Sequence, residues 1–94
     1  MLQEKQTSLF ELGRLLITPA AQSTLDNQDV IKALERHLSG DWGDCCSEDW
    51  EANKQALTED ERLFSVYHDR NTVKFWIITE ADRTATTILL PEDY

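Results

Sequence analysis

The chain has 94 residues, 40% of them hydrophobic, and 18 acidic against nine basic residues give a net charge of −9. This length suits one domain with a single core, and the hydrophobic fraction favours a folded globule over a disordered chain. The acidic balance disfavours direct nucleic-acid binding, which requires positive surface to displace counterions. No apolar run approaches the ~20 residues of a membrane-spanning helix. With no signal-peptide pattern and only two, adjacent, cysteines, we expect a cytoplasmic protein without a membrane partner.

Residues 1–7 carry no pattern and are predicted to be a disordered tail, which leaves 8–94 as a single domain. The next stretch can be interpreted in two ways. Ser8 with Glu11 matches a helix capping box, whereas Gly13 weakens a helix and the apolar residues also alternate as in a strand. We favour a strand over about Phe10 to Ile17.

Two helices are expected next. Thr18-Pro19 is typical of a helix start, because proline lacks the N–H that would be unpaired there, and this short helix should run to about Leu25. Asp26-Asn27 breaks it and can cap a second helix, which Ser39-Gly40 ends. The second helix, 28–38, should place these residues on one face: Val30, Ile31, Leu34 and Leu38.

A third helix should follow the glycine-containing connection 40–46, with Ser47 as its cap and Trp50 and Leu57 on its inner face. It should end near Thr58. Acidic side chains in its first turn would complement the helix dipole. Negative charge is concentrated in this region, where only Lys54 is basic and eight residues are acidic: Asp41, Asp44, Glu48, Asp49, Glu51, Glu59, Asp60 and Glu61.

The C-terminal third predicts an antiparallel meander of three short runs, 62–68, 73–79 and 86–90, rich in β-branched and aromatic residues. The Thr-rich run 84–87 fits an edge strand. In the middle strand, Phe75 and Ile77 lie on one face and Trp76 and Ile78 on the other. Because short helices would cover the second face only in part, we expect a homodimer or a partner surface around Trp76. The predicted fold class is α+β, a three- to four-stranded antiparallel sheet with about three helices inserted between strand 1 and the meander.

The chain resembles a small uncharacterised bacterial family found on plasmids and other mobile elements. The resemblance covers the residues after the first seven and is carried by Phe10-Glu-Leu-Gly-Arg14, by GDWG at 40–43, by Glu48–Asn53, and most specifically by WIITEADRTATTILLPEDY at 76–94. Some members are labelled type I restriction methylase subunits. A methylase needs a glycine-rich cofactor loop and an Asn/Asp-Pro-Pro-aromatic turn, whereas this chain has three glycines and no such turn. The resemblance transfers no functional residue.

Catalytic and metal-binding interpretations are disfavoured. A structural zinc site takes four ligands in spaced pairs, whereas Cys45 and Cys46 are adjacent. We expect both thiols to be buried or half-buried, His37 to lie at the core boundary and His68 to be exposed. The acidic surroundings of Cys45 disfavour a thiolate nucleophile, and the Asp41–Asp44 spacing lacks the pattern of an EF-hand. We therefore expect no enzyme, metal or cofactor.

The loop 80–83 has two interpretations. Asp82 and Arg83 either hydrogen-bond the turn or form a recognition loop on the sheet.

Our leading hypothesis is a non-enzymatic acidic interaction protein of mobile-element origin that binds a basic protein surface. Its most concrete form is a DNA-mimicking inhibitor of a restriction or CRISPR complex. Its partner-binding residues would be the eight acids of 41–61 with Trp76, Asp82 and Arg83. The alternative is a structural homodimer or accessory subunit that associates through the apolar sheet face, and a small enzyme ranks third.

Overall fold

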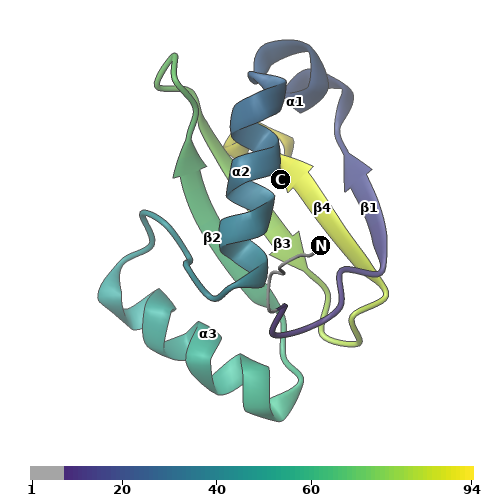
Figure 1. Ribbon diagram of the computed structural model, residues 1–94, viewed down its shortest axis with the longest axis vertical. Coiled ribbons are helices and arrows are strands. Elements are labelled where there is room, and N and C mark those ends of the chain that lie inside the picture. The colour runs from purple at the N-terminus through teal and green to yellow at the C-terminus, as the bar shows by residue number, and fades with distance from the viewer. Residues whose placement is uncertain (1–7) are drawn as a thin grey trace, which may run out of the picture.

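The α+β prediction is confirmed by a computed structural model, which describes residues 8–94 (Figure 1). Four strands, three α-helices and one 3-10 helix make up this part of the chain. Their order is β1 Arg14–Ile17, α1 Pro19–Thr24, α2 Asn27–Leu38, α3 Ser47–Glu59, β2 Leu63–His68, β3 Lys74–Thr79, β4 Ala85–Leu89 and η1 Pro91–Asp93. The prediction of a tail at 1–7 lies outside the described residues.

The strands form one sheet in the order β1-β4-β3-β2. Strands β2, β3 and β4 pair antiparallel as the predicted meander. Strand β1 pairs parallel with β4, with Leu15 opposite Thr86, so the sheet is mixed. The expectation that 84–87 is an edge strand is wrong, because β1 pairs with the outer side of β4 and is itself the edge strand.

Strand β1 is shorter than the predicted Phe10–Ile17. Gly13 has a φ of +66°, and a Cβ at this position would collide with the backbone of Thr84. The left-handed backbone interrupts the extended conformation here, since only glycine adopts it without strain. The strand therefore begins at Arg14.

The helix starts follow the sequence signals for α1 and α2. The Thr18 hydroxyl accepts a hydrogen bond from the Ala21 N–H at 3.2 Å, and the Asp26 carboxylate accepts one from the Asp29 N–H at 3.1 Å. For α3 the predicted cap is wrong. Cys46 occupies the N-cap position without a side-chain hydrogen bond, and Ser47 is the first helical residue.

Two apolar clusters hold the layers together. The larger lies between helices α1 and α2 and one side of the sheet, which we call the helix face (Figure 1). It contains Tyr67, Phe75, Ile77 and Ile88 from the strands. The smaller joins Trp42, 1% exposed, to Ala56 of α3 and Leu63 of β2, so Trp42 folds into the core.

The inner side of α2 differs from the prediction. Ile31 is 58% exposed, while Ala33 and His37 are buried beside Val30. His37 is therefore a core residue, completely shielded from solvent, and the expectation that it lies at the boundary is wrong.

A chain of buried hydrogen bonds explains how the core accommodates His37. The Thr86 hydroxyl donates to the Leu12 carbonyl at 2.8 Å, so the proton shared by Thr86 and Thr79, 2.8 Å apart, must come from Thr79. The Thr79 hydroxyl then accepts from Nε2–H of His37 at 2.9 Å. Nδ1 of His37 accepts from the Ser65 hydroxyl at 2.5 Å. Each hydroxyl proton has one partner, and the imidazole is neutral.

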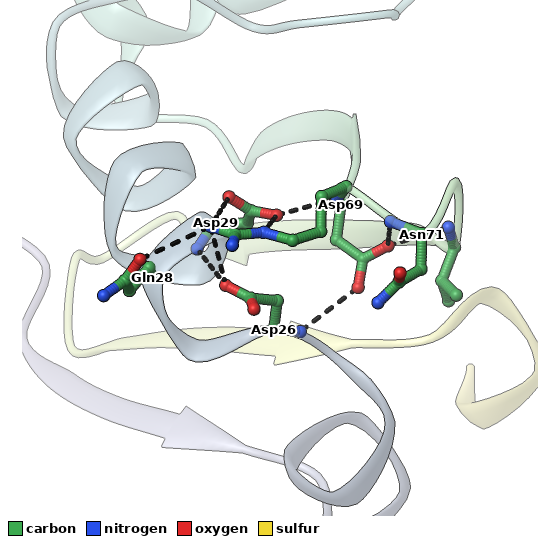
Figure 2. Close-up of polar contacts among 7 residues, drawn as sticks. Asp26, Gln28, Asp29, Asp69 and Asn71 are labelled. Atoms are coloured by element: carbon green, nitrogen blue, oxygen red, sulfur yellow. Dashed lines mark hydrogen bonds and ion pairs between the residues drawn. The ribbon is translucent and has the colours of Figure 1, made fainter.

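The turn between β2 and β3 is tied to the start of α2 through Asp69, which is 5% exposed (Figure 2). Its carboxylate accepts from the backbone N–H of Asp26, Asn71 and Val73 at 2.9–3.1 Å. Burial alone would raise the pKa of Asp69, but these three N–H groups outweigh it and lower the pKa. Arg70 adds ion pairs to Asp29 at 3.0 Å and to Asp26 at 3.3 Å.

Protonation of His37 should destabilise the fold at acid pH. Burial, with the charge of Arg83, lowers the pKa of His37 from 6.5 to about 3, so the unfolded chain binds the proton more tightly. Stability is therefore lost as pH falls from 6.5 towards 3. The linkage relation predicts that this group contributes a loss of roughly 2–3 kcal/mol in the free energy of unfolding between about pH 7.5 and about pH 4.5.

The measurement is urea unfolding of the wild type and of His37→Gln, an uncharged side chain that can donate and accept in the same chain. The difference between the two proteins should shift by that amount across the pH range, which removes the titration of carboxylates common to both. A constant difference would contradict a buried neutral His37.

Candidate functional site

Helix α3 lies beyond the β2 edge of the sheet (Figure 1). Hydrogen bonds from α3 and from the segment before it hold both to that edge. The Asn53 amide donates to the Phe64 carbonyl at 2.7 Å and accepts from the Phe64 N–H at 3.0 Å. Further along, the Val66 N–H donates to the Trp42 carbonyl at 3.1 Å, and the Asp44 N–H donates to the Val66 carbonyl at 2.7 Å. The outer edge of β2 thus has partners, as sheet edges require to avoid pairing with other chains.

The side of the sheet opposite α1 and α2, which we call the open face, carries a groove of about 380 Å³. Phe64, Trp76 and Ile78 project to this face, since they alternate with the buried residues of the helix face. The groove is lined by these three, by Asp49, Ala52 and Asn53 of α3, and by Arg62 and Tyr94.

The aromatic rings of the groove stand at steep angles to one another. Phe64 and Trp76 have centroids 5.1 Å apart at 74°, and Trp76 and Tyr94 have centroids 5.6 Å apart at 69°. The Arg62 guanidinium lies 5.6 Å from the centre of the Tyr94 ring and donates to its hydroxyl at 2.8 Å. The groove therefore combines aromatic rings with two charged side chains, Asp49 and Arg62.

The predicted acids divide into two groups in the structure. Asp41 pairs with Arg36 at 2.8 Å, and Asp44 pairs with His68 at 2.8 Å. The hydrogen bond from Arg36 lowers the pKa of Asp41, with help from the Gly43 N–H, against the opposing effect of partial burial. Both carboxylates are thus paired within the chain, at its surface.

The other acids lie on α3 and just after it. Glu51 lies 3.8 Å from Lys54, with both side chains well exposed, a geometry that contributes little energy. Among residues 8–94, no ion pair within 4.0 Å involves the remaining five: Glu48, Asp49, Glu59, Asp60 and Glu61. Asp49 reaches the groove, and Glu48 lies one turn from groove-lining Ala52 on the same side of the helix.

The loop residues Asp82 and Arg83 hydrogen-bond locally. Asp82 accepts from the Thr84 N–H and hydroxyl at 3.1 and 2.6 Å, and these bonds lower its pKa. Arg83 donates to the carbonyls of Ala56 at 3.0 Å and Glu61 at 2.7 Å. Its guanidinium therefore holds the end of α3 to the β3–β4 turn, and this geometry favours the turn interpretation over the recognition loop.

The cysteines differ from each other. Cys45 is half-buried, and its Sγ donates to the Phe64 carbonyl at 3.3 Å. Burial and the charge of Asp49 raise the pKa of Cys45 to about 11, so the thiol stays protonated at neutral pH. Cys46 is exposed, which corrects the expectation that both thiols are buried or half-buried. Within the described residues, no group of three or more His, Cys, Asp and Glu is arranged to hold a metal ion.

The structure brings Asp49 and Trp76 to one groove but leaves Asp41, Asp44, Asp82 and Arg83 elsewhere, held by internal bonds. Sequence reasoning missed Phe64, Arg62 and Tyr94 as neighbours of Trp76. Alternation along 62–68 puts Arg62 and Phe64 on one face of their strand, and this signal could have identified them. The position of Tyr94 depends on η1, which no sequence pattern indicated.

Comparisons of this chain with protein-family models, with curated proteins and with solved structures find no match. None of the helices in residues 8–94 combines the length and the hydropathy needed to cross a lipid bilayer.

The role of Arg83 can be separated from a binding role by its effect on stability. Arg83→Ala removes the donors to four carbonyl oxygens and should lower the free energy of unfolding by about 2–4 kcal/mol. Arg83→Lys, which keeps the charge but not the planar fork, should lose more than half of that. Urea unfolding measures both, and wild-type stability in Arg83→Ala would show that this side chain is free to bind a partner.

Proposed function

We propose that this chain is a non-enzymatic interaction protein that binds a basic protein surface through the exposed carboxylates of α3 and the residues that follow it. The observation that carries the proposal is that five of these six carboxylates, all except Glu51, have no ion-pair partner within the described part of the chain. Over the 13 residues of α3, a rise of about 1.5 Å per residue separates Glu48 from Glu59 by roughly 17 Å.

The most concrete form of this proposal is an inhibitor that imitates DNA in a restriction or CRISPR complex. Double-stranded DNA carries a charge about every 1.7 Å along its axis, and a protein that replaces it must display carboxylates in rows. Acids at both ends of α3 supply part of such a row. The internal pairs of Asp41 and Asp44 shorten it, so the surface fits a limited basic patch better than a long DNA groove.

The open face favours a second candidate, a homodimer. Trp76 and Tyr94 there are available to a second copy. Against this, two chains of net charge −9 repel each other, and only a large apolar contact would overcome that repulsion.

Charge reversal on α3 tests the first proposal. Glu48→Lys with Glu59→Lys should weaken binding of a fluorescein-labelled lysine-serine peptide at low salt by about fivefold or more, because each exposed charge contributes a fraction of a kcal/mol. Fluorescence anisotropy measures the affinity. The matched control, Glu11→Lys with Glu35→Lys, changes the net charge equally at exposed positions outside α3 and should lose much less. Equal losses would mean that net charge alone attracts the peptide.

Sedimentation velocity at low and high salt tests the homodimer. The acidic-surface proposal predicts a monomer at both salt concentrations. At low salt the negative charges repel each other, and at high salt, where this repulsion is screened, no apolar contact holds two chains together. A dimer that persists at high salt and dissociates in Trp76→Leu would favour the second candidate.

A further inference from the structure

We propose that the groove on the open face binds an arginine side chain of the basic partner, with its guanidinium against the Trp76 indole and its charge balanced by Asp49. This inference rests on the proposed function and names the residue type by which the partner is anchored. It depends on Trp76 and on Asp49, the carboxylate of α3 that lines the groove, and not on Glu59 at the far end of the helix, so it can fail while the acidic-surface proposal stands.

The groove is large enough to accept one side chain. Its volume of about 380 Å³ is near the lower end of the roughly 300–1,000 Å³ typical of small-molecule pockets. Ile78, which lines it, is 4% exposed, so the base of the groove is apolar and well packed. The rings of Phe64, Trp76 and Tyr94, steeply inclined to one another, offer π-faces to a planar group that enters from solvent.

The charges at the rim select a cation. Asp49 lines the groove directly, and Glu48 extends the negative potential along α3. The one cation at the rim, Arg62, is already engaged with the Tyr94 ring and hydroxyl, which leaves the Asp49 side without a positive partner among residues 8–94. An apolar anchor would leave that carboxylate uncompensated, whereas a cation balances it.

Arginine fits this combination better than lysine. Its guanidinium is planar, more weakly hydrated than an ammonium, and stacks on aromatic rings while it donates to a carboxylate. Tryptophan gives the strongest cation–π attraction of the aromatic residues. The Arg62–Tyr94 contact is an example of the same chemistry within this chain.

The test uses fluorescein-labelled peptides of sequence Lys-Ser-X-Ser-Lys, in which X is Arg, Lys, Leu or Gly, measured by fluorescence anisotropy with the full chain. The Arg peptide should bind about fivefold more tightly than the Gly peptide, as expected for one cation–π contact beside a carboxylate, with Lys in between. Trp76→Leu should abolish this preference, and Asp49→Asn should reduce it.

Glu51→Gln is the matched control, because Glu51 belongs to the same helix but does not line the groove; it should keep the preference for Arg. If Trp76→Leu does not fold, Tyr94→Leu replaces it, since Tyr94 is 69% exposed, and it should halve the preference or more. Thermal unfolding verifies that each variant is folded.

Four results would overturn the inference. Equal affinities for all four peptides, still sensitive to charge reversal on α3, would leave the acidic-surface proposal intact and remove the arginine site. If the Leu peptide binds most tightly, the groove takes an apolar anchor. If the wild type is a dimer and Trp76→Leu is a monomer, the groove takes a second copy of this chain. If no peptide binds, both this inference and the proposed function fail.

Discussion

The molecule is shaped by one constraint: β3 carries large apolar side chains on both faces, but the α-helices cover one. Phe75 and Ile77 are completely buried against the helix face. Trp76, on the opposite side, is shielded only in part, by Phe64, Tyr94 and the flank of α3. Apolar surface left in contact with water costs about 25 cal/mol per Å², so the exposed part of Trp76 carries a cost that the buried side chains of the helix face do not.

Three arginines are engaged away from the acidic side chains of α3 and leave their negative charge uncompensated. Arg36 and Arg70 pair with carboxylates near the sheet, and Arg83 donates to backbone carbonyls at the end of α3. These cations stabilise the fold where they lie, and none of them neutralises the outward acids of α3. A chain with the same composition but with these arginines on α3 would present a mixed, nearly neutral surface. One of these acids, Asp49, lines the groove together with Trp76 of the open face.

Local signals predicted much of the fold. Thr18-Pro19 and Asp26 gave helix starts that the structure contains, because a cap depends on a few adjacent atoms. His37 could not be predicted as buried, because its burial depends on Ser65 and Thr79, which are 28 and 42 residues away. The parallel pairing of β1 has the same origin. In the site, the position of Trp76 followed from alternation. The contacts of Asp41 with Arg36 and of Asp44 with His68 could not be predicted, because they join residues that only the folded chain brings together.

Asn53 imitates a peptide group at the outer edge of β2, with one donor and one acceptor facing the backbone of Phe64. This imitation depends on the amide nitrogen. Deamidation of Asn53 in an ageing sample would replace that donor by a second acceptor oxygen and set a buried negative charge against the Phe64 carbonyl. Helix α3 would then lose one of its attachments to the sheet, although Arg83 and the contact of Ala56 with Leu63 would remain. Asn53 also lines the groove, so chemical ageing at one buried amide would alter the wall of the groove.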